Sequence, residues 1–231
     1  MKTILTCIAA ILISGTSQAQ QVENTTVLGS EVFSFIAKEG YRYPYFQKGK
    51  VFFSNAEPGG GRLNYNYLLQ TMQFIGDKGD TLIFEDETNV KMVTIGTDTF
   101  IYENGFYEKM ASGSKLKLFR KCSLKVNEAQ KLGAFGKPAI TTSIVSADQV
   151  QGDGILAYKI GVNEEFKFMK KTSFYVSVGN GELMELNKHS INELLSDDKV
   201  AQVNEYIKKN GLSVKKEKDV LALFEYISQI I

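Results

Sequence analysis

Short β-prone runs separated by turn residues occupy most of the chain between residues 32 and 124, and this pattern restricts the possible folds more than any other feature. Such spacing is typical of an antiparallel meander. The strongest turn signal is Asn104-Gly105, because both residues tolerate the positive φ that a two-residue hairpin turn requires. The expected strands are 31–37, 50–54, 62–75, 81–85, 90–95, 100–103, 106–110 and 115–124.

A second group of strands is expected after a less regular, glycine-bearing stretch at 127–154. This group comprises 155–160, 166–178 and 182–186, with Asn180-Gly181 as a hairpin turn. After Leu186 the apolar period changes from two to about 3.6, which predicts helices. Asn187 or Ser190 is expected to cap the first helix and Ser196 the second, and Gly211 is expected to end the second.

The predicted fold is therefore α+β and mainly β. We expect an antiparallel meander forming a sandwich-like or barrel-like sheet, followed by two or three C-terminal helices that pack on it. The predicted organisation is a signal peptide at 1–19, a β-rich domain at 20–186 and a helical appendage at 187–231.

The N-terminal segment has the order of a secretory signal: Lys2, an apolar run at 4–13, and then small and polar residues. Ser17 and Ala19 stand where a signal peptidase needs small side chains, which predicts cleavage after Ala19. The apolar run is too short to span a bilayer, which needs roughly 20 apolar residues. We expect an exported protein, periplasmic or associated with the cell surface, with no transmembrane helix in the mature chain.

Charge and cysteine content restrict the partners. The whole chain has 27 basic and 26 acidic residues, and loss of Lys2 with the signal peptide balances the two signs. This balance argues against nucleic acid, whose recognition needs a basic excess. Only Cys122 remains after cleavage, so no intramolecular disulfide is expected. The basic residues within 115–125 alternate in part with leucines, which indicates a solvent-facing sheet surface or, alternatively, a patch for an acidic partner.

Motifs for metals and cofactors are missing from the sequence. One cysteine and one histidine, His189, do not supply a tetrahedral zinc set, and the turn aspartates lack the spacing of a calcium loop. The glycine-rich segment 57–62 lacks the Lys-Ser/Thr pair of a phosphate loop and is expected to be a flexible loop. We predict no cofactor, no metal, no catalytic residue, and a partly exposed His189 at a helix start.

An aromatic cluster supplies the candidate ligand-binding residues, which are Tyr41, Arg42, Tyr43 and Tyr45. Tyrosine combines a flat apolar face with a polar tip, which suits a sugar or peptide ligand. Core packing or a sheet edge is the alternative interpretation of the same residues.

Two stretches are typical of one group of bacterial proteins: 63–66 followed by 72–75 and 79–82, and 171–175 followed by 203–212. In these stretches the chain resembles a family of exported bacterial envelope proteins of unknown function. The resemblance spans most of the mature chain. It implies an envelope location, with no activity and no functional residues to carry over.

The leading hypothesis is a non-catalytic envelope protein that binds a ligand or a partner protein. One alternative is a hydrolase of a glycan or peptide that uses carboxylates near strand ends, with Glu85, Glu87, Glu103 and Glu108 as candidates. Another is a structural module that adds a strand to a partner at an exposed sheet edge.

Overall fold

The computed structural model describes residues 20–133, 160–161 and 163–231. These residues form one antiparallel sheet and several helices, which confirms the predicted α+β, mainly β class. The strands are β1 Gln20–Leu28, β2 Gln47–Phe53, β3 Gly59–Asn66, β4 Thr71–Ile75, β5 Thr81–Ile83, β6 Val90–Ile95, β7 Asp98–Tyr102, β8 Phe106–Ser112, β9 Leu116–Lys131, β10 Glu164–Val178 and β11 Met184–Glu185. The helices are α1 Val32–Glu39, α3 Lys188–Leu194, α4 Asp197–Asn210 and α5 Glu217–Ile230, with short 3-10 turns at Gly29–Glu31 and Glu87–Asn89.

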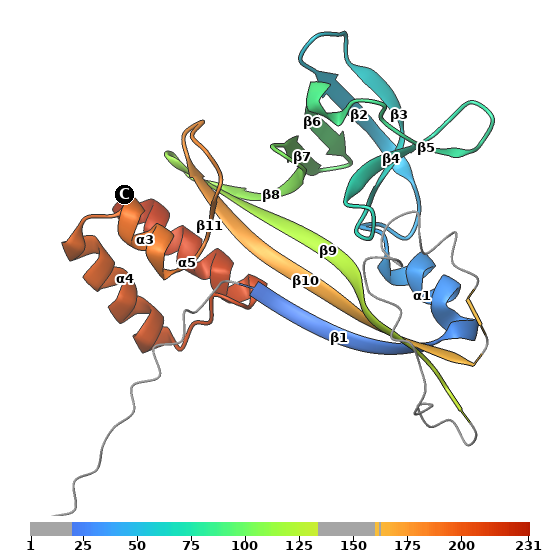
Figure 1. Cartoon of the computed structure of the whole chain (residues 1–231). Helices are drawn as coiled ribbons and strands as arrows, with labels where there is room; N and C mark the ends of the chain where they lie inside the picture. The colour runs from blue at the N-terminus through green and yellow to red at the C-terminus, as the bar shows by residue number, and fades with distance from the viewer. Residues whose placement is uncertain (1–19, 134–159, 162) are drawn as a thin grey trace, which may run out of the picture.

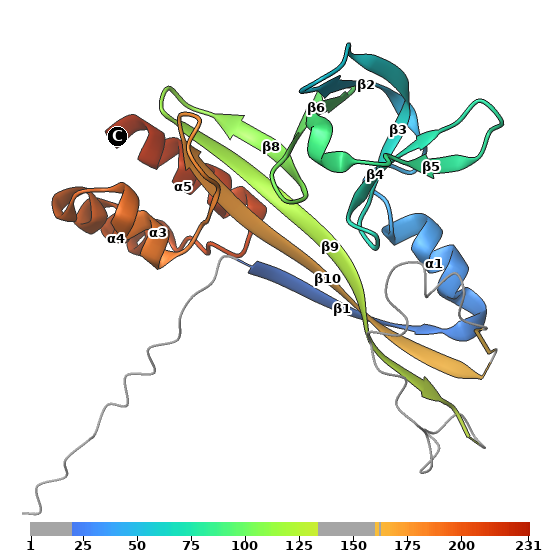
Figure 2. The same ribbon diagram turned by 45° about the horizontal axis from the view of Figure 1, so that its top comes forward.

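The sheet is open, with strand order β1-β10-β9-β8-β7-β6-β2-β3-β4-β5 and β11 beside β10. β1, β9 and β10 form a long curved ribbon, and β2–β7 curl away from it at one end (Figure 1). The helices α3–α5 lie at the opposite end of the ribbon in both views (Figure 2). The two ends of the sheet therefore have different coverings.

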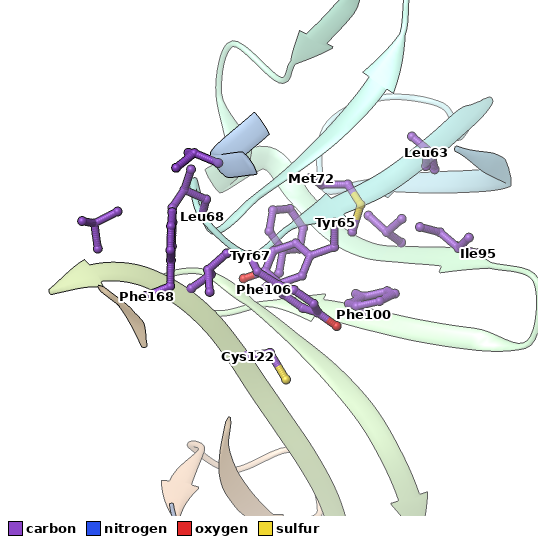
Figure 3. Close-up of a cluster of buried hydrophobic side chains, with 14 of the residues drawn as sticks. Leu63, Tyr65, Tyr67, Leu68, Met72, Ile95, Phe100, Phe106, Cys122 and Phe168 are labelled. Carbon is purple, nitrogen blue, oxygen red and sulfur yellow. The ribbon is translucent and has the colours of Figure 1, made fainter. Parts of the chain in front are cut away.

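The first hydrophobic core lies where the curled strands meet β9, β10 and α1 (Figure 3). Tyr65 of β3 is its centre, because its ring lies 5.9 Å from Phe100 and 6.0 Å from Phe106. Phe35 of α1 reaches the same core and contacts Phe168 of β10 at 4.7 Å between ring centroids. Burial of each such ring contributes about 1.5–3 kcal/mol, so this contact surface is a major source of stability.

The second core joins the C-terminal helices to the other end of β9 and β10. Leu118 and Phe174 from the strands are fully buried against Val203, Val220 and other apolar residues of the helices. Two predicted caps are confirmed: the Asn187 side chain accepts from the backbone N–H groups of His189 and Ser190, and Gly211 ends α4 at φ 60°. Ser196 stands at the predicted N-terminal position of α4, but its side chain makes no capping hydrogen bond and donates to Asp198 instead.

The hairpin signal at Asn104-Gly105 is also confirmed, with φ 52° and 122° between β7 and β8. Most of the expected strands appear with shifted ends. The expected strand 155–160 falls, except for Ile160, outside the described residues.

The expected strand 31–37 is wrong, because this segment forms helix α1. Val32, Phe35 and Ile36 have helical spacing and face the core, whereas Phe33 is 57% exposed. The aromatic and β-branched residues favour strands intrinsically. Burial of one helical face outweighs that preference.

Residues 57–75 also differ from expectation. The predicted flexible loop at 57–62 is wrong from Gly59 onward, since β3 begins there. The single strand expected at 62–75 is two strands joined by a tight turn in which Gln70 adopts φ 55°. β1 was not predicted, because only three of its nine residues are apolar and it lies at the sheet edge.

Candidate functional site

The segment that follows α1 carries all four candidate residues and is fastened to β3. The backbone N–H of Arg42 donates to the carbonyl of Tyr65 at 2.9 Å. The side chain of Asn64 accepts from the Tyr43 N–H at 3.1 Å and donates to the Tyr43 carbonyl at 2.8 Å. Tyr41 forms an isolated bridge with Asn66. The backbone of the segment is therefore held in one position over the sheet.

Arg42 belongs to a half-buried ion-pair network centred on Glu108 of β8. Its Nε and Nη2 donate to the two Glu108 carboxylate oxygens at 3.0 and 2.9 Å. Arg120 of β9 binds the same two oxygens at 2.9 and 2.8 Å and reaches Glu217 of α5 at 2.7 Å. Asp98 accepts from Arg42 Nη2 at 3.2 Å. The network ties the loop, two strands and a helix together.

The network sets the protonation of its members. Burial acts to lower the pKa of Arg120, but the hydrogen bonds and charge of Glu108 outweigh it and raise that pKa. Burial also raises the pKa of Tyr43, and the hydrogen bond of its hydroxyl to Asp98 at 2.6 Å raises it further. Arg120 stays charged and Tyr43 stays neutral at ordinary pH. Both act as hydrogen-bond donors.

Tyr41 lies in the wall of a hollow of about 880 Å³ between β3, β4, β5 and the turn that precedes β6. Its lining combines several kinds of side chain: the aromatic rings Tyr41, Phe84 and Tyr102, the aliphatic Leu69, Leu82 and Ile83, the hydroxyls Thr71 and Thr81, the amides Asn66 and Gln73, and the carboxylates Glu85, Asp86 and Glu87. The Asn66 amide donates to Gln73 at 3.2 Å, and the Thr71 hydroxyl donates to Glu87. The hollow therefore offers both flat apolar surfaces and hydrogen-bonding groups.

A second, more polar hollow of about 400 Å³ lies beside Tyr41, Arg42 and Arg120. Cys122 also lines it, with its Sγ 3.4 Å from the Thr172 hydroxyl. Burial raises the pKa of the Cys122 thiol, so the uncharged thiol dominates at neutral pH. A thiol without thiolate character is a poor nucleophile.

The four candidate residues differ in whether they line one of these hollows. Tyr41 lines both hollows, and Arg42 lines the smaller one while serving the ion-pair network. Tyr43 lines neither and is bound to Asp98. Tyr45 is 77% exposed and also lies outside both. Of the four, only Tyr41 and Arg42 therefore adjoin these two hollows.

Sequence reasoning missed the polar residues around Tyr41. Asn64, Asn66 and Gln73 are nearly inaccessible to solvent, although they are polar residues in strands. Arg120 was assigned to a solvent-facing surface, but its side chain is only 16% exposed. The alternation of asparagine with tyrosine at 63–67 was the available signal, because a two-sided buried strand must satisfy its polar face internally.

The other candidate groups are dispersed. Glu85 and Glu87 line the larger hollow, Glu108 is held by two arginines, and Glu103 accepts from the Leu183 N–H at 3.4 Å. His189 is 81% exposed at the start of α3, near Glu193. Within the described residues no cluster of three or more His, Cys, Asp or Glu side chains is arranged to hold a metal ion. The helices of that same part of the chain are all too short or too polar to cross a bilayer.

Comparison with family models, with curated proteins and with solved structures found no match to this chain. The resemblance to exported bacterial envelope proteins stays a prediction, as do export and cleavage after Ala19. The function is therefore inferred from the side chains around Tyr41.

Proposed function

We propose that this chain is an exported, non-catalytic binding protein that holds a short glycan of the cell envelope in the larger hollow beside Tyr41. One observation carries the proposal. The rings of Tyr41, Phe84 and Tyr102 share the wall of an 880 Å³ hollow with amide and carboxylate side chains.

This mixture of side chains suits a sugar. A sugar ring has apolar C–H faces that stack on aromatic rings, and its rim of hydroxyls needs donors and acceptors in fixed positions. The exposed side chains of Thr81 and Glu85 supply such groups. Behind them, the nearly buried Asn66 and Gln73 are bonded to each other, and the side-chain carbonyl of Asn66 accepts from the Leu68 N–H at 2.9 Å. The volume falls within the roughly 300–1,000 Å³ of small-ligand sites.

The acidic groups support binding over catalysis. Glycoside hydrolysis uses two carboxyl groups on opposite sides of the bond that breaks. Asp86 is committed to the turn before β6, where it accepts from the Thr88 N–H at 3.0 Å and the Asn89 amide at 2.6 Å. Glu87 accepts from the Thr71 hydroxyl. Glu85 alone keeps a carboxylate without such a commitment among the described residues.

A hydrolase is the second candidate function, because Glu85 and Glu87 line the same hollow. The two proposals differ in what Glu85→Gln does. A binding protein keeps most of its glycan affinity after this change and releases no product. A hydrolase has measurable turnover on envelope polysaccharide and loses it in the variant.

The test is calorimetric titration of the purified protein with soluble oligosaccharide fragments of envelope polysaccharide. Tyr41→Ala should weaken binding about tenfold, because loss of one stacked ring removes about 1–1.5 kcal/mol. Tyr45→Ala is the matched control and should bind as the parent does, since Tyr45 lies outside the hollow. Unchanged affinity in Tyr41→Ala would discard this placement of the site. A measured mass of the intact protein that matches a chain beginning at Gln20 would support export.

A further inference from the structure

The first half of β3 is an open sheet edge. Gly59–Leu63 pair with β2 on one side, but pairing with β4 on the other side begins only at Leu63, opposite Phe74. After Ile75 the chain turns at Gly76, whose N–H donates to the Asp80 carbonyl at 2.9 Å, and continues into β5. The β4–β5 hairpin projects sideways from β3 (Figure 1). Within the described residues no strand accompanies residues 59–62 on that side.

Three consecutive glycines form this edge, and the packing of the protein does not require them. A Cβ at Gly61 would have no heavy atom within 4 Å, and one at Gly59 would meet only a Phe53 ring carbon at 3.7 Å. Gly49 in the neighbouring strand is different, since its Cβ would lie 2.4 Å from the Thr94 carbonyl oxygen. Glycine weakens a strand and often marks a place where another backbone approaches closely.

An apolar hollow of about 330 Å³ lies on the inner side of the same edge. Phe53, Phe74, Phe84 and Leu82 line it together with the three glycines. The rings of Phe74 and Phe84 are stacked with centroids 5.1 Å apart. Leu82 is 39% exposed, so the hollow is open to a visiting side chain.

The outer side of the edge is basic. Lys48 and Arg62 are directly opposite each other in the β2–β3 pair, and Lys50 is opposite Gly60 on the same face. Like charges in opposite positions destabilise a sheet. None of the three has an ion-pair partner among the residues described. Carboxylates of a bound molecule would complement this face.

We infer that an extended acidic peptide of a partner protein adds as an extra strand beside Gly59–Arg62. Its backbone bonds to the free edge of β3, an apolar residue enters the hollow at Phe74 and Phe84, and the alternating acidic residues face Lys48, Lys50 and Arg62. Main-chain bonds supply affinity in this binding mode, and the pockets for alternate side chains supply specificity. This proposal goes beyond glycan binding and uses a different hollow, although Leu82 and Phe84 line both hollows.

The experiment is a fluorescence titration with a labelled seven-residue peptide in which glutamate alternates with valine and leucine. Gly61→Leu places a side chain in the hollow, because residue 61 shares the inner face with Leu63, and it should weaken binding at least about tenfold. Tyr45→Leu is the control, since Tyr45 lies outside both this hollow and the β3 edge, and affinity should change by less than about threefold. Thermal unfolding of both variants checks that they fold.

Charge and backbone controls complete the test. The same peptide with lysine in place of glutamate should bind at least about tenfold more weakly, and N-methylation of its alternate amides should abolish binding. Tyr41→Ala should leave peptide binding unchanged, so failure of one proposed site is distinguishable from failure of the other.

Three outcomes would overturn the inference. One is no binding of the acidic peptide at about 1 mM. Another is equal affinity of the parent and Gly61→Leu for that peptide. The last is a concentration-dependent dimer that Gly61→Leu abolishes, because the edge would then pair with a second copy of this chain.

Discussion

The two ends of the long sheet differ in how fully their apolar side chains are buried. At the helical end, Leu118, Phe174 and Val176 are covered by α3–α5 and are almost completely buried. At the curled end, Leu82 and Ile83 are 39% and 57% exposed beside the hollows. The protein covers one apolar surface with its own chain and leaves the other open. The open end is therefore where a ligand or partner gains most by covering it.

The largest predicted effect is on the free energy of unfolding, which should respond differently to mutations at the two ends of the sheet. Leu223→Ala in α5 should lower the free energy of unfolding by about 3 kcal/mol, because it leaves a cavity in the core under the helices. Leu82→Ala should cost less than about 1 kcal/mol, since Leu82 is already partly in water. Urea denaturation measures both. Equal costs would show that the open end is as tightly packed as the helical end.

The ion-pair network joins the two ends, and its loss should come next in size. Glu108→Gln removes the charge that Arg42 and Arg120 share and should cost about 2 kcal/mol, because two half-buried guanidinium groups lose their common partner while Arg42 keeps Asp98 and Arg120 keeps Glu217. Glu128→Gln is the control, since the Glu128–Lys167 pair is largely solvated and is worth less than about 1 kcal/mol. A similar loss in both variants would contradict a structural role for the network.

Alkaline pH should lower the free energy of unfolding through two tyrosines at the curled end. Burial raises the pKa of Tyr65, and burial with the Asp98 hydrogen bond raises that of Tyr43, from the ordinary value of 10.0. The folded chain then holds protons that the unfolded chain releases, so stability is complete below pH 10.0 and falls as the pH rises above it. Denaturation midpoints measured from pH 8 to pH 11 test this sign, and a rise in stability above pH 10.0 would contradict it.

The smallest predicted effect concerns the hydroxyl of Tyr65 in the first core. The Tyr65 hydroxyl is buried and has no hydrogen-bond partner in the described part of the chain. Tyr65→Phe should therefore raise the free energy of unfolding by about 1 kcal/mol, because it removes an unsatisfied polar group. Tyr43→Phe is its counterpart and should lower stability, since it loses the bond to Asp98. A loss of stability in Tyr65→Phe would mean that its hydroxyl is satisfied in solution.

Local signals in the sequence determined much of the fold. Asn104-Gly105 specifies a turn through backbone preferences of two adjacent residues, and the change of period after Leu186 specifies the C-terminal helices through apolar spacing. The caps at Asn187 and Gly211 depend on bonds within a few residues. Such features can be predicted because the interactions that produce them lie within one short window.

Tertiary structure decided the rest. Whether 32–39 forms a helix depends on Phe168, which lies more than a hundred residues later in the chain. The environment of Arg42 depends on Glu108 and Arg120, and the hollow beside Tyr41 depends on how β4 and β5 turn away from β3. The sequence by itself determined which segments favour strands, turns and helices. Only long-range packing decided which polar side chains were buried and which apolar ones were left open, because burial depends on segments that meet only in the folded chain.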